Sequence, residues 1–433
     1  MISKNLSAIV VPLMTAGILS AWSGASAHQF KFHTLYSFCA EASCADGAGP
    51  LAALIMDQSG NLYGTTQGGG ALAHGTVFRL SPRGANKWKH ATLYSFCSQS
   101  ATCPSGGTAT GVIIDTSGNL YGTTDQSSGA DGGIIFELKP REGEWKYKQL
   151  YAFPCSGDTC PDGSHPSGLA YLGAAAGQPY DGTSPLFGSA SGGGTGGAAP
   201  QGVVFKLEPV NKRWRQRVLY NFCSALSGDC ADGSLPFGTP VVDGTGRLFG
   251  TTEGGGATGS GTVYSLNGTS ESVIYSFCPA GSENCVDGMM PVAPVFLDNF
   301  GHIVGTTGAG GVNGPNGDGT LFTVSGAGEQ VLYSFCSKAN CSDGLRPTAG
   351  VIEDSAGDIF GVTAEGGNDN GDGVLFEYRD GTMRVLHTFG GGADGCGPVG
   401  GLIIDASGNL YGTTSGCGIA GGGTLFELEK RSQ

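Results

Sequence analysis

Positive charge is scarce in this chain of 433 residues, which has 22 lysines and arginines against 36 aspartates and glutamates and a net charge of −14. Binding to a nucleic-acid backbone needs clustered lysine and arginine. The composition therefore argues against a nucleic-acid partner, and it also disfavours docking onto anionic lipid. Long apolar runs are absent beyond Ala8 to Trp22, so no other segment is expected to cross a bilayer.

The first 27 residues have the pattern of a secretory signal peptide. Lys4 precedes the apolar run, and Ala25-Ser26-Ala27 supplies small residues for cleavage. Residues 28–433 are then expected to form one domain and a monomer. Because the last residues offer no anchor, the protein is expected to be secreted or periplasmic.

Catalytic motifs are missing as well. The sequence has no Gly-x-Ser-x-Gly elbow before a helix, no His-Glu-x-x-His and no haem attachment motif. His165, Asp162 and His74 are weak catalytic candidates, since a histidine in a loop rich in glycine and proline is more often only solvated.

Repetition is what the chain has in abundance. The ten residues from Asp115 to Thr124, Asp-Thr-Ser-Gly-Asn-Leu-Tyr-Gly-Thr-Thr, recur in altered form five times, and a degraded copy ends at Leu186-Phe187-Gly188. The five further copies are residues 57–66, 243–252, 298–307, 354–363 and 405–414. Seven copies with a period near 58 residues indicate a repeat architecture.

Each repeat predicts four antiparallel strands and no helix. In the second repeat, Ala109 to Asp115 and Leu120 to Thr124 flank a tight turn, then come Gly133 to Leu138 and Trp145 to Phe153. A meander needs cover for its edges, which radial repetition in a β-propeller supplies. The recurring aromatic residues are expected to pack between neighbouring blades.

The two ends predict ring closure. The exported chain opens with a fourth-strand sequence, Phe32 to Phe38, and ends after a third-strand sequence, Gly423 to Leu428. We therefore predict an all-β, seven-bladed propeller of four-stranded antiparallel blades, closed by the N-terminal strand joining the last blade.

All fourteen cysteines fall into close pairs, one for each repeat. The pairs are Cys39/Cys44, Cys97/Cys103, Cys155/Cys160, Cys223/Cys230, Cys278/Cys285, Cys336/Cys341 and Cys396/Cys417. In an exported chain this pattern predicts disulfides. Zinc binding is the alternative, which the spacing and the lack of regularly placed histidines disfavour. Cys396 and Cys417 lie in two different loops, which come close together only if the four strands of the blade have the proposed order. This pair therefore tests the predicted strand order.

We label the four strands of a blade a to d from the axis outwards. The meander places the b–c and d–a loops on one face, here called the long-loop face, and the short a–b and c–d turns on the other. The long loops hold seventeen acidic residues against Lys338 and Arg346. Such a face repels polyanions and attracts cations. The repeated Asp-Gly pairs are expected to be turn residues. Ligand-binding candidates on this face are Glu253, Glu365, Asp125 and Arg346.

Calcium is the one cofactor that the sequence suggests, and none is required by it. Asn368, Asp369, Asn370 and Asp372 place oxygen atoms in the alternation of a calcium loop, although the closing glutamate is absent. Repeat three also departs from the pattern, because residues 172–182 replace its short turn. Such an insertion either shapes a pocket or partner contact, or reflects loop drift.

The complete pattern, Leu-Tyr-Ser-Phe, Asp-Gly-x-x-Pro, Asp-x-x-Gly-Asn-Leu-Tyr-Gly-Thr-Thr and Gly-Thr-Val-Phe, resembles the GloVer-type tandem-repeat proteins of bacteria, which also carry HAF or choice-of-anchor labels. The likeness covers nearly all of residues 33–428. It implies export and a propeller-like fold, and it brings no catalytic residues. The cysteine pairs and the lack of an anchor depart from it.

We therefore expect a binding or scaffolding module that engages an extracellular glycan or protein through its long-loop face. The alternative is an enzyme, such as a polysaccharide lyase or hydrolase, or a lactonase-like metal-dependent hydrolase with acids around the central channel. Fold alone does not separate these functions.

Overall fold

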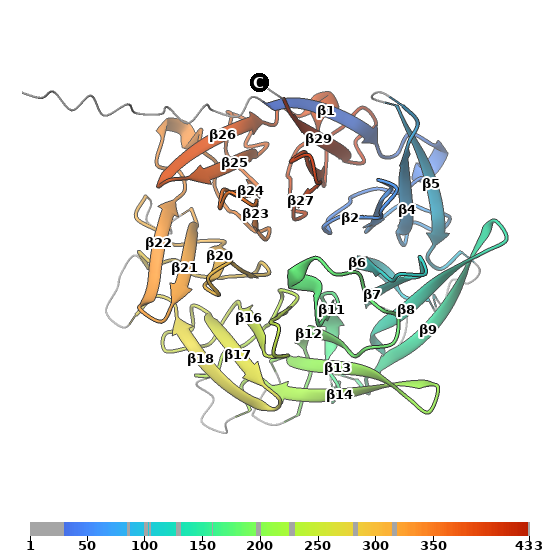
Figure 1. The fold of residues 1–433 in the computed structure, drawn as a ribbon, viewed down its shortest axis with the longest axis horizontal. Helices are drawn as coiled ribbons and strands as arrows, with labels where there is room; N and C mark the ends of the chain where they lie inside the picture. The colour runs from blue at the N-terminus through green and yellow to red at the C-terminus, as the bar shows by residue number, and fades with distance from the viewer. Residues whose placement is uncertain are drawn as a thin grey trace, which may run out of the picture.

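Seven antiparallel sheets stand around a central axis in the computed structural model, as Figure 1 shows. The structure describes residues 30–84, 87–98, 103, 105–126, 131–157, 159–195, 201–224, 230–279, 285–313 and 318–431. The predicted signal peptide, residues 1–27, lies outside the described residues. The chain is thus an all-β, seven-bladed propeller, as predicted.

Each blade has its first strand at the axis and its fourth at the rim. Blade one contains β2 (Ile55–Met56), β3 (Leu62–Thr66), β4 (Thr76–Pro82) and β5 (Trp88–Ser95). Blade two contains β6 (Gly107–Ile114), β7 (Leu120–Gln126), β8 (Asp131–Arg141) and β9 (Glu144–Pro154). Blade three contains β10 (Ser164–Pro166) and β11 (Ala170–Tyr171), which both pair with β12 (Leu186–Gly192), then β13 (Val203–Val210) and β14 (Arg213–Asn221).

The remaining blades follow the same order. Blade four contains β15 (Val241–Val242), β16 (Leu248–Thr252), β17 (Thr262–Asn267) and β18 (Ser270–Ser276). Blade five contains β19 (Phe296–Leu297), β20 (Ile303–Thr307), β21 (Thr320–Ser325) and β22 (Gly328–Ser334). Blade six contains β23 (Ile352–Glu353), β24 (Ile359–Thr363), β25 (Val374–Arg379) and β26 (Thr382–Thr388). Blade seven contains β27 (Ile403–Ile404), β28 (Leu410–Thr414), β29 (Thr424–Lys430) and β1 (Phe30–Ser37).

Blade seven is built from both ends of the chain. Strand β1 pairs with β29 in antiparallel register, with Phe30 opposite Lys430 and Ser37 opposite Thr424. The predicted closure is therefore confirmed, and Figure 1 shows the blue β1 lying beside the dark red β29. Closure leaves no blade without neighbours on both sides.

Helix is limited to short turns. The described residues contain four 3-10 helices of three residues each: η1 (Ala42–Cys44), η2 (Ala174–Ala176), η3 (Ala339–Cys341) and η4 (Gly392–Asp394). None of the helices in the described part of the chain is long and apolar enough to cross a membrane.

Neighbouring blades are joined by one recurring aromatic contact. A phenylalanine at the end of each fourth strand meets an aromatic ring in the third strand of the next blade, at centroid distances of 5.0 to 5.4 Å. The seven pairs are Phe38–Phe78, Phe96–Phe136, Phe153–Phe205, Phe222–Tyr264, Phe277–Phe322, Phe335–Phe376 and Phe389–Phe426. This confirms that the repeated aromatics form the core.

The glycine of the Leu-Tyr-Gly-Thr-Thr motif makes room for that ring. A Cβ atom at Gly361 would lie 2.5 Å from Cζ of Phe376, and one at Gly412 equally close to Phe426. Any larger residue would push the ring out of the blade interface, which accounts for glycine at this point of the motif.

The two threonines of the motif have different tasks. The first donates a hydrogen bond to the next blade: Thr65 Oγ1 to the Ala109 carbonyl (3.2 Å) and Thr306 Oγ1 to the Ala349 carbonyl (3.1 Å). The second bonds within its blade, as Thr66 Oγ1 does with Thr76 Oγ1 at 2.9 Å. These bonds satisfy the buried hydroxyls of Thr65, Thr66 and Thr306.

The aspartate that opens the motif shapes the a–b turn. Asp57 Oδ1 accepts hydrogen bonds from the backbone of Ser59 (2.8 Å) and Asn61 (2.9 Å), and its Oδ2 accepts one from Tyr63 (3.0 Å). These bonds lower the pKa of Asp57 against the opposing effect of burial. The turn aspartates are therefore structural, as expected for hairpin residues.

The aromatic contact between blades generates the first prediction. Phe335→Ala removes a fully buried ring that packs on Phe376, and it should lower the free energy of unfolding by about 3 to 5 kcal/mol. Phe300→Ala is the matched control, because Phe300 is 85% exposed, and it should change stability by less than about 0.5 kcal/mol. Denaturant unfolding of both variants measures the difference, and equal losses would contradict the packing account.

His90 generates a second prediction, on pH. Its ring stacks on Tyr36 with centroids 4.4 Å apart, and burial lowers its pKa from 6.5 to about 4. The folded state therefore resists protonation that the unfolded chain accepts, and stability falls as pH drops from about 6.5 towards 4. At pH 4.5 the loss is about 2.5 kcal/mol, from about 1.4 kcal/mol per unit of pKa.

The matched variant for this effect is His90→Phe, which copies Phe32 at the equivalent position of blade seven. The difference in unfolding free energy between the native protein and this variant should move by about 2.5 kcal/mol in the variant's favour between pH 7.5 and pH 4.5. A difference independent of pH, measured by denaturant titration, would show that His90 is not held neutral.

Candidate functional site at the channel mouth

The central channel is an apolar tube formed by all seven blades. It has a volume of about 410 Å³, and its wall includes Leu51, Val112, Leu169, Val295 and Val399. None of the residues that line it is charged, and its polar groups are hydroxyls and backbone. Ligand pockets of this size and character are common in proteins. A wall without acids gives no support to catalysis by acids inside the channel.

One residue from each blade surrounds the mouth of the channel on the long-loop face. It is the residue at the fourth position of Asp-Gly-x-x-Pro, two residues before the point where most blades begin to line the channel. We call these seven residues the mouth ring: Gly49, Thr108, His165, Leu235, Met290, Arg346 and Gly397. All seven have a left-handed backbone, with φ between 56 and 64°.

Bonds between blades impose this backbone shape. The N–H of a ring residue donates to the preceding blade, as Leu235 does to the Gln201 carbonyl (2.8 Å) and Arg346 to the Asp318 carbonyl (2.7 Å). Its own carbonyl accepts from the end of the second strand, as Leu235 does from Glu253 N (3.0 Å). The backbone is thus fixed, whereas the side chain is free to vary.

Glycine is the residue that this conformation favours, yet five ring positions carry other residues. A left-handed residue with a Cβ costs about 1 to 2 kcal/mol, and such strain is concentrated at functional sites. Thr108 and Leu235 are the clearest cases, since branched and bulky residues are rare with this backbone. The strained, non-repeating side chains therefore mark the mouth ring as the candidate site.

Charged and apolar groups are separated around the ring. His165 Nδ1 lies 2.9 Å from Asp125 Oδ1, and Arg346 Nη1 donates to Glu365 Oε1 at 2.8 Å. The side chains of His165 and Arg346 are 48% and 57% exposed, so a ligand can reach both pairs. Exposed pairs of this kind add little to stability.

The apolar part of the mouth comes from blades four and five. Met290 is 38% exposed, and Phe237, two residues beyond Leu235, is 42% exposed in the channel. Glu253 follows β16 and donates its backbone N–H to Leu235, and burial raises the pKa of its carboxyl. Four predicted ligand-binding residues, Glu253, Glu365, Asp125 and Arg346, thus lie at or beside this ring.

Most of the Asp-Gly acids serve the fold. In each of five blades the carboxylate accepts a hydrogen bond from the fourth-strand tyrosine: Tyr36 to Asp46, Tyr151 to Asp162, Tyr220 to Asp232, Tyr275 to Asp287 and Tyr333 to Asp343. The same carboxylates accept backbone N–H groups of the cysteine loop, as Asp46 does from Ala40 at 3.0 Å. In blade six His387 replaces the tyrosine beside Asp394, and in the blade-one to blade-two loop Ser105 replaces the aspartate.

These tyrosine–aspartate pairs, here called clamps, hold the cysteine loops against the blades. Burial is the main cause that raises the pKa of Tyr36 above its ordinary range, and its bond to Asp46 adds to the effect. The sequence predicted that the aspartates of the Asp-Gly pairs accept hydrogen bonds from nearby backbone N–H groups in turns. The observed bonds agree with that prediction. The tyrosine partner was missed, although a tyrosine stands 10 to 12 residues before each of these five aspartates in the sequence.

All seven predicted cysteine pairs form disulfides, and no described cysteine is free. Such bonds persist in oxidising compartments. The three clusters of potential metal ligands among the described residues each contain a bonded pair, so the sulfur atoms are not available to zinc. The seven bonds are Cys39–Cys44, Cys97–Cys103, Cys155–Cys160, Cys223–Cys230, Cys278–Cys285, Cys336–Cys341 and Cys396–Cys417.

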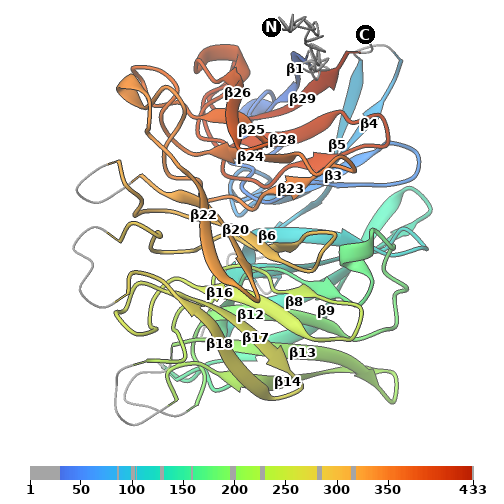
Figure 2. The same cartoon turned by 60° about the vertical axis from the view of Figure 1, so that its left-hand side comes forward.

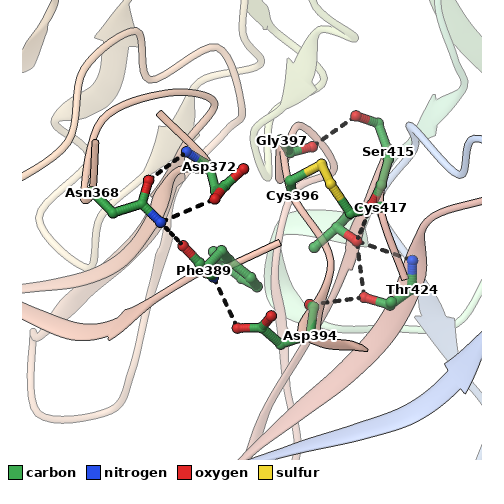
Figure 3. The surroundings of a disulfide bond; sticks show 12 residues. Asn368, Asp372, Phe389, Asp394, Cys396, Gly397, Ser415, Cys417 and Thr424 are labelled. Carbon is green, nitrogen blue, oxygen red and sulfur yellow. Dashed lines mark hydrogen bonds between the residues drawn. A yellow bond between two sulfur atoms is a disulfide. The ribbon is translucent and has the colours of Figure 1, made fainter. Parts of the chain in front are cut away.

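The bond of blade seven differs from the other six. Cys396 and Cys417 join two different loops of this blade, with Cα atoms 5.3 Å apart, as Figure 3 shows. The sequence predicted that these two loops meet only if the blade is built from four strands in the expected order. The bond therefore confirms the strand order of the blade.

The second cysteine of a pair has a further role that the sequence did not predict. The Cys160 carbonyl accepts hydrogen bonds from the N–H groups of Gly163 (3.0 Å) and Gly194 (2.8 Å). The carbonyls of Cys230 and Cys285 each accept two equivalent bonds from glycines, all of them 2.9 Å long. The sequence assigned these three cysteines only a disulfide. Their disulfides are confirmed, and the backbone of these cysteines also ties the d–a loop to the b–c loop of the same blade.

The predicted calcium loop lies next to the Cys396–Cys417 disulfide. Asn368 Oδ1 accepts the backbone N–H groups of Asn370 (3.0 Å) and Asp372 (3.3 Å), and Asn368 Nδ2 donates to Asp372 Oδ2 (3.0 Å). Figure 3 shows Asn368 turned towards Asp372 and Phe389. Asp369 and Asn370 are exposed. The loop is thus an Asn-capped turn, and calcium there stays a prediction.

The three catalytic candidates, His165, Asp162 and His74, form hydrogen bonds with different partners and not with one another. Asp162 belongs to a clamp with Tyr151, whereas His165 pairs with Asp125 of the preceding blade. The His74 carbonyl accepts the N–H of Thr108, and a Cβ at Gly107 would lie 3.3 Å from His74 Nδ1. The pairing of His165 with Asp125 was not foreseen, because 40 residues separate them.

The blade-three insertion docks on the opposite, short-turn face. The carbonyl of Tyr180 accepts the N–H of Thr116 in blade two (3.0 Å), and its buried ring meets Tyr121 at 5.2 Å. Helix η2 lies next to β15 of blade four. Figures 1 and 2 show this green segment near the axis on one face and projecting from it. The insertion therefore ties three blades together.

Comparison with known proteins adds a family. The family model of the Gloeobacter/Verrucomicrobia repeat matches residues 16–183 and 312–433, which together are more than half of the chain. The protein belongs to the Gloeobacter/Verrucomicrobia repeat family. The repeat family expected from the sequence is thus confirmed at this level. No curated protein matches the chain.

Several solved structures resemble this family member at low identity. A candidate 6-phosphogluconolactonase from Bacteroides uniformis has a TM-score of 0.49 at 12% identity, covering 86% of this chain and 92% of that one. A gluconolactonase from Xanthomonas campestris scores 0.39 at 10%, covering 93% and 90%. A candidate oxidoreductase (glucose dehydrogenase) from Thermus thermophilus scores 0.40 at 15%, covering 73% and 95%.

The mouth ring of this Gloeobacter/Verrucomicrobia repeat protein generates a third prediction. Thr108→Gly relieves a left-handed threonine, and it should leave stability unchanged or raise it by up to about 1 kcal/mol. Thr92→Gly, at an exposed point of β5 outside the left-handed region, should lower stability by about 1 kcal/mol. Thermal unfolding of the pair checks the sign, and a large loss at Thr108 would refute the strain.

Proposed function

We propose that this protein is a secreted binding module that takes its ligand at the mouth ring on the long-loop face. The observation that carries the proposal is the left-handed backbone of all seven ring residues. The backbone has a structural task in every blade, while the side chains differ from blade to blade. The side chains that differ between repeats at these positions would then determine which ligand is bound.

The use of the acids supports binding over catalysis. The acidic long-loop face contains six Asp-Gly carboxylates that cap loops or pair with the fourth strand, so they are not available for chemistry. The channel wall is uncharged. No cofactor is needed for such a module, and calcium at Asp369 and Asp372 would be an additional ligand.

Of the two ligand classes expected, a protein segment suits the mouth better than a glycan. The ring puts Leu235, Met290 and Phe237 on one side and the ion pairs of His165 and Arg346 on others. A chain that presents apolar and charged side chains matches this distribution, and an apolar anchor fits the channel. Glycans commonly stack on exposed aromatic rings. Phe237 is the exposed aromatic residue that the described part of the mouth offers for such stacking.

One observation favours the enzyme alternative. The His165–Asp125 pair is half-exposed and has the hydrogen bond that orients a histidine for general base catalysis. A hydrolase or lyase of polysaccharide would need this pair for turnover. His165→Gln at the mouth would abolish such turnover, whereas it would only weaken binding.

The experiment is selection of binders by the purified protein, residues 28–433, from a displayed peptide library, in parallel with a glycan array. We expect enriched peptides with an apolar residue beside a charged one. The triple variant Leu235→Gly, Met290→Gly and Arg346→Gly should weaken their binding at least tenfold by calorimetry while the melting temperature holds, because glycine suits these backbones.

The control is Phe300→Ala on the short-turn face, which should bind the same peptides unchanged. Peptides that ignore the triple variant, or no enrichment at all, would overturn the proposal. Array hits without peptide hits would replace protein by glycan. Cleavage of an array sugar that His165→Gln abolishes would establish the enzyme. Repeating the titration in EDTA and in calcium tests the metal.

A further inference from the structure

The basic residues of this acidic protein are gathered on the rim of three adjacent blades. The outer hairpins of blades one to three, β4–β5, β8–β9 and β13–β14 with their turns, hold 13 of the 22 lysines and arginines against five acids. We call this surface the basic rim. Figure 1 shows the hairpins β8–β9 and β13–β14 reaching past the body of the ring.

The other four blades have no such surface. Strands β17–β18 and β21–β22 of blades four and five contain no lysine or arginine, and the outer strands of blades six and seven contain Arg379, Arg384, Lys31 and Lys430. The outer strands of these last two blades also carry acids, among them Glu377 and Glu427. Basic charge on the rim is therefore a property of one side of the molecule.

The charges of the basic rim face solvent and are mostly unpaired. Lys89, Lys146, Arg213, Arg215 and Arg217 are exposed, and within the described ranges none of them forms an ion pair. Arg213, Arg215 and Arg217 alternate on β14, so they project from one face of the strand about 7 Å apart. An extended row of uncompensated cations suits an extended polyanion.

The aromatic residues between these cations are turned away from solvent. Trp214 lies between Arg213 and Arg215, and its ring packs against Tyr121 of the preceding blade at 6.4 Å. Trp88 packs likewise against Tyr411 of blade seven. The basic rim therefore offers charge without the aromatic platforms on which nucleic-acid bases stack.

A groove at the edge of the basic rim could hold a negatively charged group. It lies between blades three and four, has a volume of about 410 Å³, and its wall includes Lys206, Arg217, Leu219 and Gly268. Lys206 pairs with Glu208 at 2.7 Å, whereas Arg217 is free to meet an anion. Gly246 and Thr269 on its blade-four side are uncharged, so nothing there opposes a negative group.

We infer that the basic rim binds an acidic polysaccharide, with a carboxylate or sulfate seated at Arg217 in the groove and further anions along β14. Charge complementarity, the outward row of arginines and the inward tryptophans carry this inference. It is independent of the mouth ring, which lies on the long-loop face. One face would then hold the extracellular matrix while another remains open to its ligand.

The test is binding of polygalacturonate and of dextran sulfate to the immobilised protein by interferometry, at 50 and 300 mM NaCl. We expect binding at low salt that weakens at least tenfold at high salt, because exposed charges are screened. Arg213→Gln, Arg215→Gln and Arg217→Gln together should weaken binding at least tenfold at 50 mM NaCl. The melting temperature of this variant verifies its fold.

Two controls sharpen the result. A second triple variant, Lys31→Gln, Lys338→Gln and Arg431→Gln, removes equal charge from exposed positions elsewhere and should change binding less than twofold. Single-stranded DNA of matched charge should bind more weakly than the polysaccharides. Absence of polysaccharide binding, equal loss in both triple variants, equal binding of neutral dextran, or tighter binding of DNA would each overturn the inference.

Discussion

The structure depends on one contact made seven times, the ring of a phenylalanine at the end of each fourth strand against an aromatic ring in the next blade. Burial of these rings joins sheets that could not be stable alone, and it requires glycine in the neighbouring second strand. Because β1 completes blade seven, the contact Phe389–Phe426 beside it belongs to the same series. The ring of blades is therefore closed by the same aromatic contact that joins every other pair of neighbouring blades.

Repeated and unrepeated residues have divided tasks. The repeated threonines bond between and within blades, the turn aspartates cap hairpins, and the Asp-Gly carboxylates clamp the cysteine loops. Most of these polar groups are at least partly buried and hydrogen-bonded, so replacing one is expected to lower stability. In the mouth ring the backbone conformation is the same in every repeat, whereas the side chains vary. His165 and Arg346 of the proposed site therefore differ from the residues at the equivalent positions of the other repeats.

The propeller presents two surfaces of opposite character. The long-loop face is acidic around a mouth that carries both ion pairs and apolar side chains, whereas the rim of blades one to three is basic. At physiological ionic strength charges are screened over about 8 Å, so the two surfaces act separately in spite of the net charge of −14. A protein of this shape is suited to hold two different partners at once.

The number of blades, their strand order, the closure of the ring and all seven disulfides could be predicted from the sequence, because each follows from a local pattern and its period. The contacts between residues of different blades could not be predicted in this way, because they depend on how the folded repeats pack together. The pairing of His165 with Asp125, the docking of Tyr180 on blade two and the left-handed backbone of Leu235 arise from hydrogen bonds and packing between neighbouring repeats. The pattern within one repeat does not specify such contacts, so the arrangement of the candidate site follows from the three-dimensional packing of the blades.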